Sequence, residues 1–503
     1  MRKKALLFAL VLGLCTTLLG CAGGNGTGKT SSGQNNSIVV GIQNDLDSLD
    51  PHLAETAGTR EVMYNVFEGL VKPSANGDLV PAVASDYKVS EDGKVYTFTL
   101  RENVKFHNGE AVTAEDVKYS IERNAGKLDE DLLVSAFKII ESVNIVDPST
   151  VEVVLSEADT ELIGYMTVAI LPKDYANQKT APVGTGPFKF VSYTPQQNLK
   201  LEKFEDYWQE NSPSLDAVEF RIVQNTDSVI MDLKAGSIDV YPYLTDAQAA
   251  ELSGTFNIEA GNSNLTQAMY LNHDHEILGN KLVRQALCYA IDRDEIMSIV
   301  AGGKGTKLGS ALYPGFGKYY NDLSDKYSYD VEKAKSLLKE AGYENGFEFT
   351  IKIPSNYQFH VSTGEVIVEQ LKKINVTAKI ELIDWTSWVS DVYGGRQFEA
   401  TIVGIDAKLA PSDMLRRYEL DYSKNFYNYK SESYTAAFQA GLATTDDAEK
   451  VSNYQTAQEI LAEDAVAVYI MDPPTLVAVD KDLTGFTFYP IFVLDMASIS
   501  YKK

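Results

Sequence analysis

The sequence predicts a mixed α/β fold, and two observations support this. From Ile38 onward, stretches with the alternating or continuously apolar character of β-strands are interspersed with amphipathic stretches of helical period. The segments between them are long, so the pattern favours α/β layers with insertions over one doubly wound sheet. The chain has 503 residues, of which 44% are hydrophobic and 23% are charged. It is therefore long enough for ~2–4 domains and needs neither metal nor disulfides to fold.

Each expected element rests on a local pattern. In 95–100, aromatic and aliphatic residues share one face of a strand and threonines share the other. Thr113 precedes a helical stretch, and Asp330 caps another that stops at Gly342. Further strands are expected at 38–42, 151–155, 188–193, 199–203, 218–223, 268–271, 378–382 and 399–404, and helices at 281–300, 330–341, 364–374 and 452–463.

The first 20 residues have the pattern of a secretory signal peptide. Three basic residues precede an uncharged, mostly apolar run over 5–20. This run leads into Leu18-Leu19-Gly20-Cys21, which resembles the lipobox of bacterial lipoproteins, where the cysteine becomes the acylated first residue. The alternative is an uncut membrane anchor, but the run is shorter than the ~20 residues that span a bilayer as a helix. We therefore expect 1–20 to be cleaved and Cys21 to be lipidated.

Residues 21–37 are expected to form a flexible tether, because they are rich in Gly, Ser, Thr and Asn. Within them, 23–30 satisfies the G-x-x-x-x-G-K-[ST] pattern of phosphate-binding loops. That chemistry requires a strand before the loop and a helix after it, which aim backbone N–H groups at the phosphates. Here a lipid site precedes the pattern and a polar tail follows it, so we expect no nucleotide binding.

The net charge limits the classes of binding partner, and the cysteine content limits the disulfides that can form. With 45 basic and 70 acidic residues the formal net charge is −25, whereas nucleic acid and anionic membrane surfaces attract basic patches. Cys15 lies in the signal peptide and Cys21 is the lipid site, which leaves Cys288 alone and excludes an internal disulfide. Cys288 lies in an apolar helical stretch and is expected in the core.

No motif for catalysis stands out. The run His273-Asp274-His275-Glu276 has metal-ligand residue types, but we favour a polar loop after the strand at 268–271. The sequence has no H-E-x-x-H, Cys-x-x-Cys or G-x-S-x-G pattern. We therefore expect a binding protein rather than an enzyme, with no catalytic residues, no bound metal and no cofactor.

The tryptophans add one candidate for ligand contact. Trp385 and Trp388 stand one helical turn apart after the strand at 378–382. Such a pair is equally compatible with lining a ligand pocket and with packing in the core. Trp208 follows a strand and is expected to be structural.

Four stretches of the chain carry motifs in a fixed order. They are 92–109 with 113–117, Val183-Gly184-Thr185-Gly186-Pro187-Phe188 with 204–208, 283–287 with 290–293, and 329–334 with 341–343. Together they resemble the dipeptide/oligopeptide-binding proteins of ABC importers, family 5 of the extracytoplasmic solute-binding proteins. The resemblance covers nearly the whole chain after the tether, and the lipoprotein signal agrees with it.

The resemblance implies a two-lobed periplasmic-binding-protein-like fold with an extra N-terminal subdomain. Its two lobes are joined by two crossing segments and close around a ligand, which signals to the transmembrane subunits of an ABC permease. We place lobe I at 38–265 with the inserted subdomain at about 66–184, lobe II at 266–470, and a return to lobe I at 471–503. The implied protein is a monomer on the extracytoplasmic face of the membrane, held there by its lipid, as is typical of Gram-positive bacteria.

The family's ligand residues carry over in part. Peptide binders often have Gly-Trp-x-x-Asp after a strand, with the Asp on the peptide amine. Here Lys408 stands where that Asp is expected, and Asp406 lies two residues earlier. Some dipeptide binders have an Arg and a Tyr before the helix expected at 364–374; here the Tyr is present and the Arg is absent. The candidate ligand-binding residues are Asn356, Tyr357, Trp385, Asp406 and Lys408.

Two interpretations of Lys408 stay open. Either it faces the cleft and the ligand offers an anion or a blocked terminus, or it points to solvent and Asp406 or another carboxylate meets the amine. We favour the second, because solvated lysines are common. For the function, capture of peptides comes first. An oligosaccharide or metal chelate on the same scaffold comes second, and an extracellular enzyme or signalling receptor third.

We expect Cys21→Ala to release the protein from membranes, because acyl chains on this residue are the expected anchor. The measurement is the partition of the protein between membrane and soluble fractions. Unchanged retention in the membrane together with an uncut N-terminus would contradict the assignment.

Overall fold

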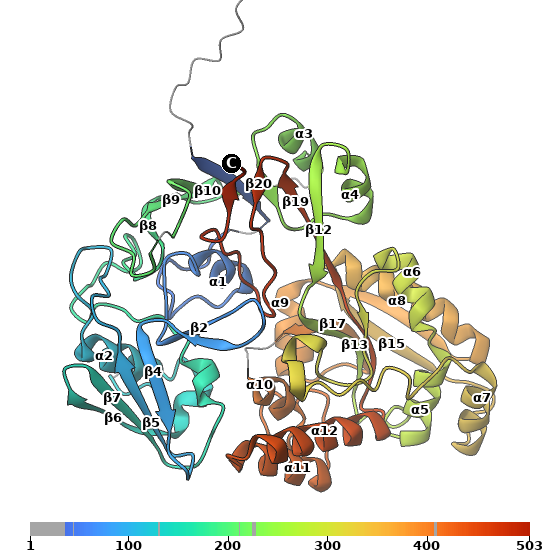
Figure 1. Ribbon diagram of the computed structural model, residues 1–503. Helices are drawn as coiled ribbons and strands as arrows, with labels where there is room; N and C mark the ends of the chain where they lie inside the picture. The colour runs from blue at the N-terminus through green and yellow to red at the C-terminus, as the bar shows by residue number, and fades with distance from the viewer. Residues whose placement is uncertain (1–35, 44, 129–130, 211, 224–227, 407–409) are drawn as a thin grey trace, which may run out of the picture. The chain divides into compact units, whose positions relative to one another are not determined.

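The computed structural model describes residues 36–503 except 44, 129–130, 211, 224–227 and 407–409. The predictions for the signal peptide, Cys21 and the phosphate-loop pattern lie outside the described residues, and so does the prediction for Lys408. From Asn36 to Lys503 the chain forms three larger β-sheets and two small ones, with helices between them (Figure 1). The mixed α/β fold class predicted from the sequence is therefore confirmed.

The seven-stranded sheet combines strands from both ends of the chain. Its order is β12-β19-β11-β1-β10-β9-β8, with β1 parallel to β10 and β11 and the other neighbours antiparallel. One face packs against α1 (Ala57–Met63), the other against α3 (Val229–Lys234) and α4 (Asp246–Leu252). The strands are β1 (Ser37–Ile42), β8 (Phe188–Thr194), β9 (Asn198–Lys203), β10 (Ala217–Ile222), β11 (Val240–Tyr241), β12 (Phe256–Asn262) and β19 (Pro474–Asp480).

The six-stranded sheet has the order β14-β18-β13-β17-β15-β16. Alternate residues of β13 enter different cores: Met269 packs with α5 to α8, and Tyr270 packs with α10 to α12. The sheet therefore lies between two layers of helices. The strands are β13 (Leu265–Leu271), β14 (Thr306–Lys307), β15 (Glu348–Pro354), β16 (Thr377–Ile383), β17 (Ala400–Asp406) and β18 (Ala467–Asp472). The helices are α5 (Lys281–Ala290), α6 (Arg293–Ala301), α7 (Val331–Glu340), α8 (Gln358–Leu371), α9 (Trp385–Ser387), α10 (Pro411–Leu415), α11 (Glu432–Ala443) and α12 (Asp447–Glu463).

A four-stranded antiparallel sheet, β4-β5-β7-β6, packs against α2. Thr113 and Asp116 form a capping box at the start of α2, as the sequence predicts. The remaining short strands pair as β2 with β3 and β20 with β21. The elements are β2 (Val71–Pro73), β3 (Leu79–Pro81), β4 (Ala84–Val89), β5 (Val95–Leu100), α2 (Ala114–Asn124), β6 (Ile140–Asp147), β7 (Thr150–Leu155), β20 (Leu483–Thr484) and β21 (Ser500–Tyr501).

Two of the sequence motifs meet at His107. Its Nε2–H donates to Gly186 O (2.9 Å) and its Nδ1 accepts from Gly184 N (3.3 Å). Burial lowers the pKa of His107 to about 4, so the ring is neutral and can both donate and accept. A Cβ on Gly184 would come within 2.1 Å of Val66 O, so only glycine allows this close approach of two backbones.

Two helix predictions differ from the structure: one expected helix is interrupted in its middle, and another begins earlier than expected. The stretch 281–300 forms two helices, because Ile291 is extended and Asp292 accepts from Glu295 N as the cap of α6. The helix expected at 364–374 begins earlier, at Gln358. The cap at Asp330 is confirmed.

Two predictions about single sites are also confirmed. Cys288 is buried in α5, and burial raises the pKa of its thiol to about 12. The run 273–276 is a polar loop after β13, in which His273 Nε2 lies 3.0 Å from Val466 O and His275 Nδ1 accepts from Leu278 N. Among the described residues, no helix has the length and apolar character needed to cross a membrane.

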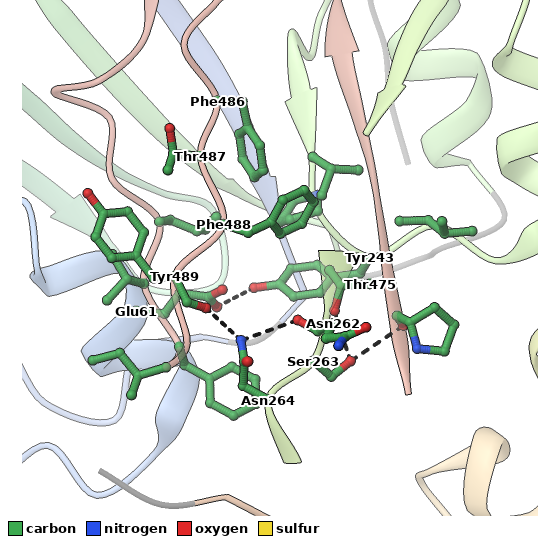
Figure 2. Close-up of a pocket in the computed structure, with 18 of the residues that line it drawn as sticks. Glu61, Tyr243, Asn262, Ser263, Asn264, Thr475, Phe486, Thr487, Phe488 and Tyr489 are labelled. Atoms are coloured by element: carbon green, nitrogen blue, oxygen red, sulfur yellow. Dashed lines mark hydrogen bonds between the residues drawn. The ribbon is translucent and has the colours of Figure 1, made fainter. Parts of the chain in front are cut away.

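Two short segments carry the chain between the seven-stranded and six-stranded sheets. Residues 262–265 link β12 to β13, and 472–474 link β18 to β19. The segments lie side by side, because Ser263 N donates to Pro473 O (2.8 Å). Figure 2 shows Ser263 and Thr475, whose hydroxyl oxygens are 2.8 Å apart. We call 262–265 and 472–474 the crossing segments.

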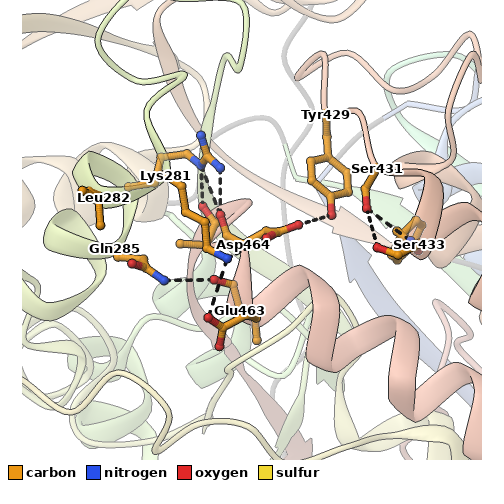
Figure 3. A network of polar contacts seen from close by, with 12 residues as sticks. Lys281, Leu282, Gln285, Tyr429, Ser431, Ser433, Glu463 and Asp464 are labelled. Carbon is orange, nitrogen blue, oxygen red and sulfur yellow. Dashed lines mark hydrogen bonds and ion pairs between the residues drawn. The ribbon is translucent and has the colours of Figure 1, made fainter. Parts of the chain in front are cut away.

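The motif 283–287 has a structural role. Arg284 is buried and donates five hydrogen bonds to four backbone carbonyls, those of Leu278, Gly279, Asp464 and Ala465. Figure 3 shows contacts made by α5 near this point, where Lys281 pairs with Asp464 (2.9 Å). Arg284 thus fixes the start of α5 against the loop between α12 and β18.

We expect Arg284→Met to destabilise the protein by roughly 3 kcal/mol, because four carbonyls lose a charged donor and part of this group is shielded from water. Lys281→Met is the control, since it removes only exposed ion pairs and should change stability by less than ~1 kcal/mol. Urea unfolding of both variants measures the difference. Equal effects of the two substitutions would contradict the structural role of Arg284.

Candidate functional site

Five strands of the six-stranded sheet have an end at one edge. β15 runs parallel to β16 and β17, so these three strands finish at the same edge. β13 is antiparallel to β17 and β18, so β13 begins and β18 ends there as well. We call this the crossing edge, because both crossing segments meet the sheet at it. Ligands of α/β sheets bind beyond the carboxyl ends of parallel strands, which makes this edge the candidate site.

Four of the five residues predicted from the sequence lie at the crossing edge. Asn356 and Tyr357 follow the end of β15, Trp385 follows the end of β16, and Asp406 is the last residue of β17. Asp406 pairs across the sheet with Leu265, the first residue of β13. Segments far apart in the sequence are thus brought together by the strand order. The fifth residue, Lys408, lies outside the described part of the chain.

Three aromatic rings at this edge form what we call the aromatic platform: Tyr357, Trp385 and Trp388. The rings of Trp385 and Trp388 are stacked at 5.0 Å, and Tyr357 stands edge-on to Trp385 at 5.4 Å. Tyr357 and Trp385 are about 40% exposed, whereas Trp388 is buried and donates to Thr401 Oγ1 (2.9 Å). Of the two roles considered for this tryptophan pair, Trp388 therefore packs in the core, and Trp385 presents its ring outward.

A buried histidine lies next to the aromatic platform, because the ring centroids of His360 and Tyr357 are 5.6 Å apart. His360 Nε2 accepts from Gly404 N (3.1 Å), and burial lowers the pKa of His360 to about 4. A neutral imidazole that accepts at Nε2 carries its proton on Nδ1, which lies 2.9 Å from the side-chain amide of Gln267. The amide must therefore present its oxygen to Nδ1–H, which also gives a partner to an otherwise unpaired buried oxygen. These bonds fix the backbone of β17 two residues before Asp406.

A cavity of about 250 Å³ adjoins the first crossing segment (Figure 2). Its walls include Leu265, the crossing-segment residue that pairs with Asp406. Tyr243 donates to Glu61 (2.5 Å) at this cavity, and Asn264 Nδ2 donates to Tyr489 O (2.5 Å). Burial raises the pKa of Glu61 to about 7. The volume is below that of typical small-molecule sites, so the cavity has room for a side chain rather than a whole peptide.

A second buried carboxyl, that of Asp472, belongs to the crossing segment 472–474. Asp472 Oδ1 accepts from Leu265 N (3.2 Å), and Oδ2 has no hydrogen-bond partner among the described residues. Burial raises the pKa of Asp472 to about 7, although the hydrogen bonds from the Leu265 and Asn264 backbone favour the charged form. The carboxyl is therefore partly protonated at neutral pH, within the connection between the two sheets.

The region of the four-stranded sheet contacts the segment that follows β17. Ser412 N donates to Glu161 (2.8 Å), and Tyr165 Oη donates to Asp413 (3.3 Å). Glu161 also forms an ion pair with buried Lys450 at 3.7 Å, and Ala410 packs in the core of the four-stranded sheet. The crossing edge therefore has a second region of the chain close by.

The chain matches a family model over 351 residues. The model describes the middle region of the bacterial extracellular solute-binding proteins, family 5, and matches residues 78–428. The chain belongs to this family. It is thus a solute-binding protein of the kind that serves ABC importers, and the resemblance noted in the sequence is confirmed.

The similarity to known relatives and to solved structures extends over almost the full length of this chain. The glutathione-binding protein GsiB of Salmonella typhimurium is 28% identical over 90% of this chain and 92% of its own. The ABC transporter-associated periplasmic binding protein DppA of Helicobacter pylori, solved with the peptide STSA, has a TM-score of 0.79 and 28% identity over 93% of this chain and 98% of its own. The protein AgaA of A. tumefaciens R10, solved with agropinic acid, has a TM-score of 0.78 and 29% identity over 93% of this chain and 99% of its own.

Sequence reasoning missed two buried carboxyls, that of Glu61 beside the cavity and that of Asp472 in a crossing segment. Glu61 and Asp472 are two among 70 acidic residues, so composition gives no reason to select them. One signal was available for Asp472. It ends an apolar strand and precedes Pro473 and Pro474, which is where a strand leaves a sheet.

We expect Asp472→Asn to change the pH dependence of stability. The folded-state pKa is about 7 against 3.8 unfolded, so folding takes up a proton in between, and the wild type loses stability as pH rises through this window. Asparagine does not titrate. The free energy of unfolding of the variant, relative to that of the wild type, should therefore increase by an amount on the order of 1–4 kcal/mol between pH 4 and pH 7. Above pH 7 the difference between the two proteins should stay constant.

Urea unfolding at pH 4 to 8 measures this change. The control is Asp391→Asn, which alters an exposed carboxylate on the π-helical turn Trp388–Gly394. A constant difference between Asp472→Asn and wild type at every pH would show that the Asp472 carboxyl has an ordinary pKa.

Proposed function

We propose that this protein is the lipid-anchored receptor of an ABC importer, and that it captures peptides or peptide-like solutes at the crossing edge. The observation that carries this is the convergence of Asn356, Tyr357, Trp385 and Asp406 on one edge of a sheet in a family 5 protein. In this proposal the lobes are 38–265, with an inserted subdomain at about 66–184, and 266–470, with 471–503 returning to the first. The ligand binds between them and promotes closure.

The aromatic platform suits the apolar part of such a ligand, and Asp406 suits its amine. Exposed Tyr357 and Trp385 offer flat apolar surface for the ligand's side chains or backbone. Burial raises the pKa of Tyr357 against a hydrogen bond from Asn356, and the charge of Asp406 adds a smaller contribution in the same direction as burial. A carboxylate beside an aromatic surface is suited to a ligand amine, which gives Asp406 the role of amine partner in this proposal.

The contacts between Glu161 and Lys450, and between Asp159 and Arg416 at 3.9 Å, support closure around the ligand. They join the inserted subdomain to the second lobe, away from the crossing segments in the sequence. Their partial burial means that solvent must re-enter when they separate. In the proposal they hold the closed form, which the permease recognises.

Non-peptide ligands form the second candidate. One relative is named for glutathione, a tripeptide with a γ-linked glutamate, and one solved structure contains agropinic acid, so chains at 28–29% identity to this one take ligands other than ordinary α-linked peptides. In this chain Ile405 stands where the Gly-Trp-x-x-Asp motif of peptide binders has its tryptophan. This replacement favours a ligand other than an ordinary peptide here as well. An oligosaccharide or a metal chelate is less consistent with a carboxylate beside the aromatic platform, and a catalytic role has no supporting residues in the described part of the chain.

We expect peptides with a free amine to bind more tightly than their acetylated forms, and Asp406→Asn to remove the difference, about 10–100-fold in affinity. Calorimetric titration of glutathione, Ala-Ala and Ser-Thr-Ser-Ala measures this, after native mass spectrometry has shown that the protein is free of carried ligand. Asp391→Asn is the matched control. If Lys408→Ala instead weakens acetylated ligands and Asp406→Asn changes nothing, the amine does not meet Asp406, and Lys408 faces the ligand.

A further inference from the structure

A buried ion pair joins two regions that are far apart in the sequence. Glu161 follows β7 of the four-stranded sheet, and Lys450 lies on α12, which packs on the six-stranded sheet. The charged atoms are 3.7 Å apart, and the two residues are only 6% and 5% exposed. Lys450 also donates to the hydroxyl of Thr160, the residue before Glu161. The lysine therefore reaches out of its own region and ends in a segment of the other.

Each charge of this pair finds its partners across the boundary between the two regions. Glu161 Oε2 accepts from Ser412 N of α10 (2.8 Å), so both partners of this carboxylate belong to the six-stranded sheet and its helices. Among the described residues, no carboxylate of α11 or α12 lies within ion-pair distance of Lys450. If one charge were absent while the regions were in contact, the other would stay buried without compensation, which is strongly unfavourable.

The contacts around the buried pair are polar and cross the same boundary. They are the hydrogen bonds of Thr160 to Thr444 O (3.3 Å), of Thr445 to Glu91 O (3.4 Å) and of Tyr165 to Asp413 (3.3 Å), and the ion pair of Arg416 with Asp159 (3.9 Å). All of these are long, so none is a strong bond. Such a boundary can open, because polar surfaces are readily hydrated when they separate, and contacts of this kind between domains are typically reversible.

No stretch of chain links these two regions directly. After β7 the chain enters β8 of the seven-stranded sheet, and it reaches the six-stranded sheet only through the crossing segment 262–265. The boundary at the buried pair is therefore held by non-covalent contacts alone. In the described part of the chain, no hydrogen bond or ion pair connects Glu161 or Lys450 to the aromatic platform or to Asp406. The pair can thus act on closure without touching the ligand.

We propose that Glu161 and Lys450 form a latch that sets the affinity of this receptor for every ligand by the same factor. The ligand is held in the closed form, so the apparent dissociation constant is the intrinsic one divided by the fraction of protein that is closed. The latch changes this fraction and leaves the contacts of the ligand unchanged. This inference rests on the proposed function, from which it takes closure around a ligand, and it adds a regulation of affinity from outside the ligand site.

The experiment removes each charge alone and then both together. Ala-Ala, Ser-Thr-Ser-Ala and glutathione are titrated into wild type, Lys450→Met, Glu161→Gln and the double variant. Each single variant should bind all three ligands about 10–100-fold more weakly, and by the same factor, because closure then buries an uncompensated charge. The double variant should recover most of the affinity, since it buries no charge at this position.

A control variant and a second measurement accompany the titrations. Lys430→Met removes an exposed lysine of the same region, which pairs with Asp274, and should leave all three affinities unchanged. Hydrogen–deuterium exchange of the Ser412 amide reports on the latch without any titration, because this N–H donates to Glu161. The amide should exchange faster in Lys450→Met than in wild type, and more slowly in wild type when Ser-Thr-Ser-Ala is bound.

Each outcome decides one question. Unchanged affinities in both single variants, or exchange at Ser412 that bound peptide does not slow, overturn the latch while peptide binding stands. Different factors for the three ligands show that the pair acts on the ligand directly, and a double variant as weak as the single ones shows general damage; either overturns the latch. If wild type binds none of the ligands, the proposal of peptide capture fails, and equal exchange at Ser412 in wild type and Lys450→Met then overturns the latch separately.

Discussion

The constraint on which the rest of the structure depends is the shortness of the crossing segments. Two residues separate β12 from β13, and one residue separates β18 from β19. With so little chain available, β13 must begin and β18 must end at the edge that faces the other sheet. Because β17 pairs antiparallel with β13, and β15 and β16 follow β17 in parallel, three more strands end at that edge. The place of the candidate site thus follows from strand direction before any side chain is considered.

The fold could be predicted from the sequence because its elements carry strong local signals. Thr113 and Asp330 cap their helices as expected, and most expected strands are present with shifts of a few residues at the ends. The break at Asp292 was missed, because the apolar residues of 281–300 continue the helical spacing across two separate helices. A local polar contact, the Asp292 cap on Glu295 N, decides the break, and hydrophobic period alone does not report such a contact.

The site could be predicted only where residues of unusual type follow a strand. Tyr357, Trp385 and Asp406 qualified, and the structure brings them to one edge. Arg417 did not stand out, because a buried Nε without a hydrogen-bond partner among the described residues leaves no mark in the sequence. Asp472 was equally invisible among many carboxylates. Absence of a partner is a property of three-dimensional packing, and a single sequence contains no record of it.

The bonding between the crossing segments also limits how the two sheets can move. Ser263 N and Pro473 O tie the segments to each other, and Leu265 N is tied to the Asp472 side chain. Twisting one sheet against the other would shear these bonds, whereas bending about the line through both segments leaves them intact. Any movement of one sheet relative to the other then approaches a motion with one coordinate. A single distance across the candidate site, such as that between two fluorescent labels, would suffice to describe the relative position of the two sheets.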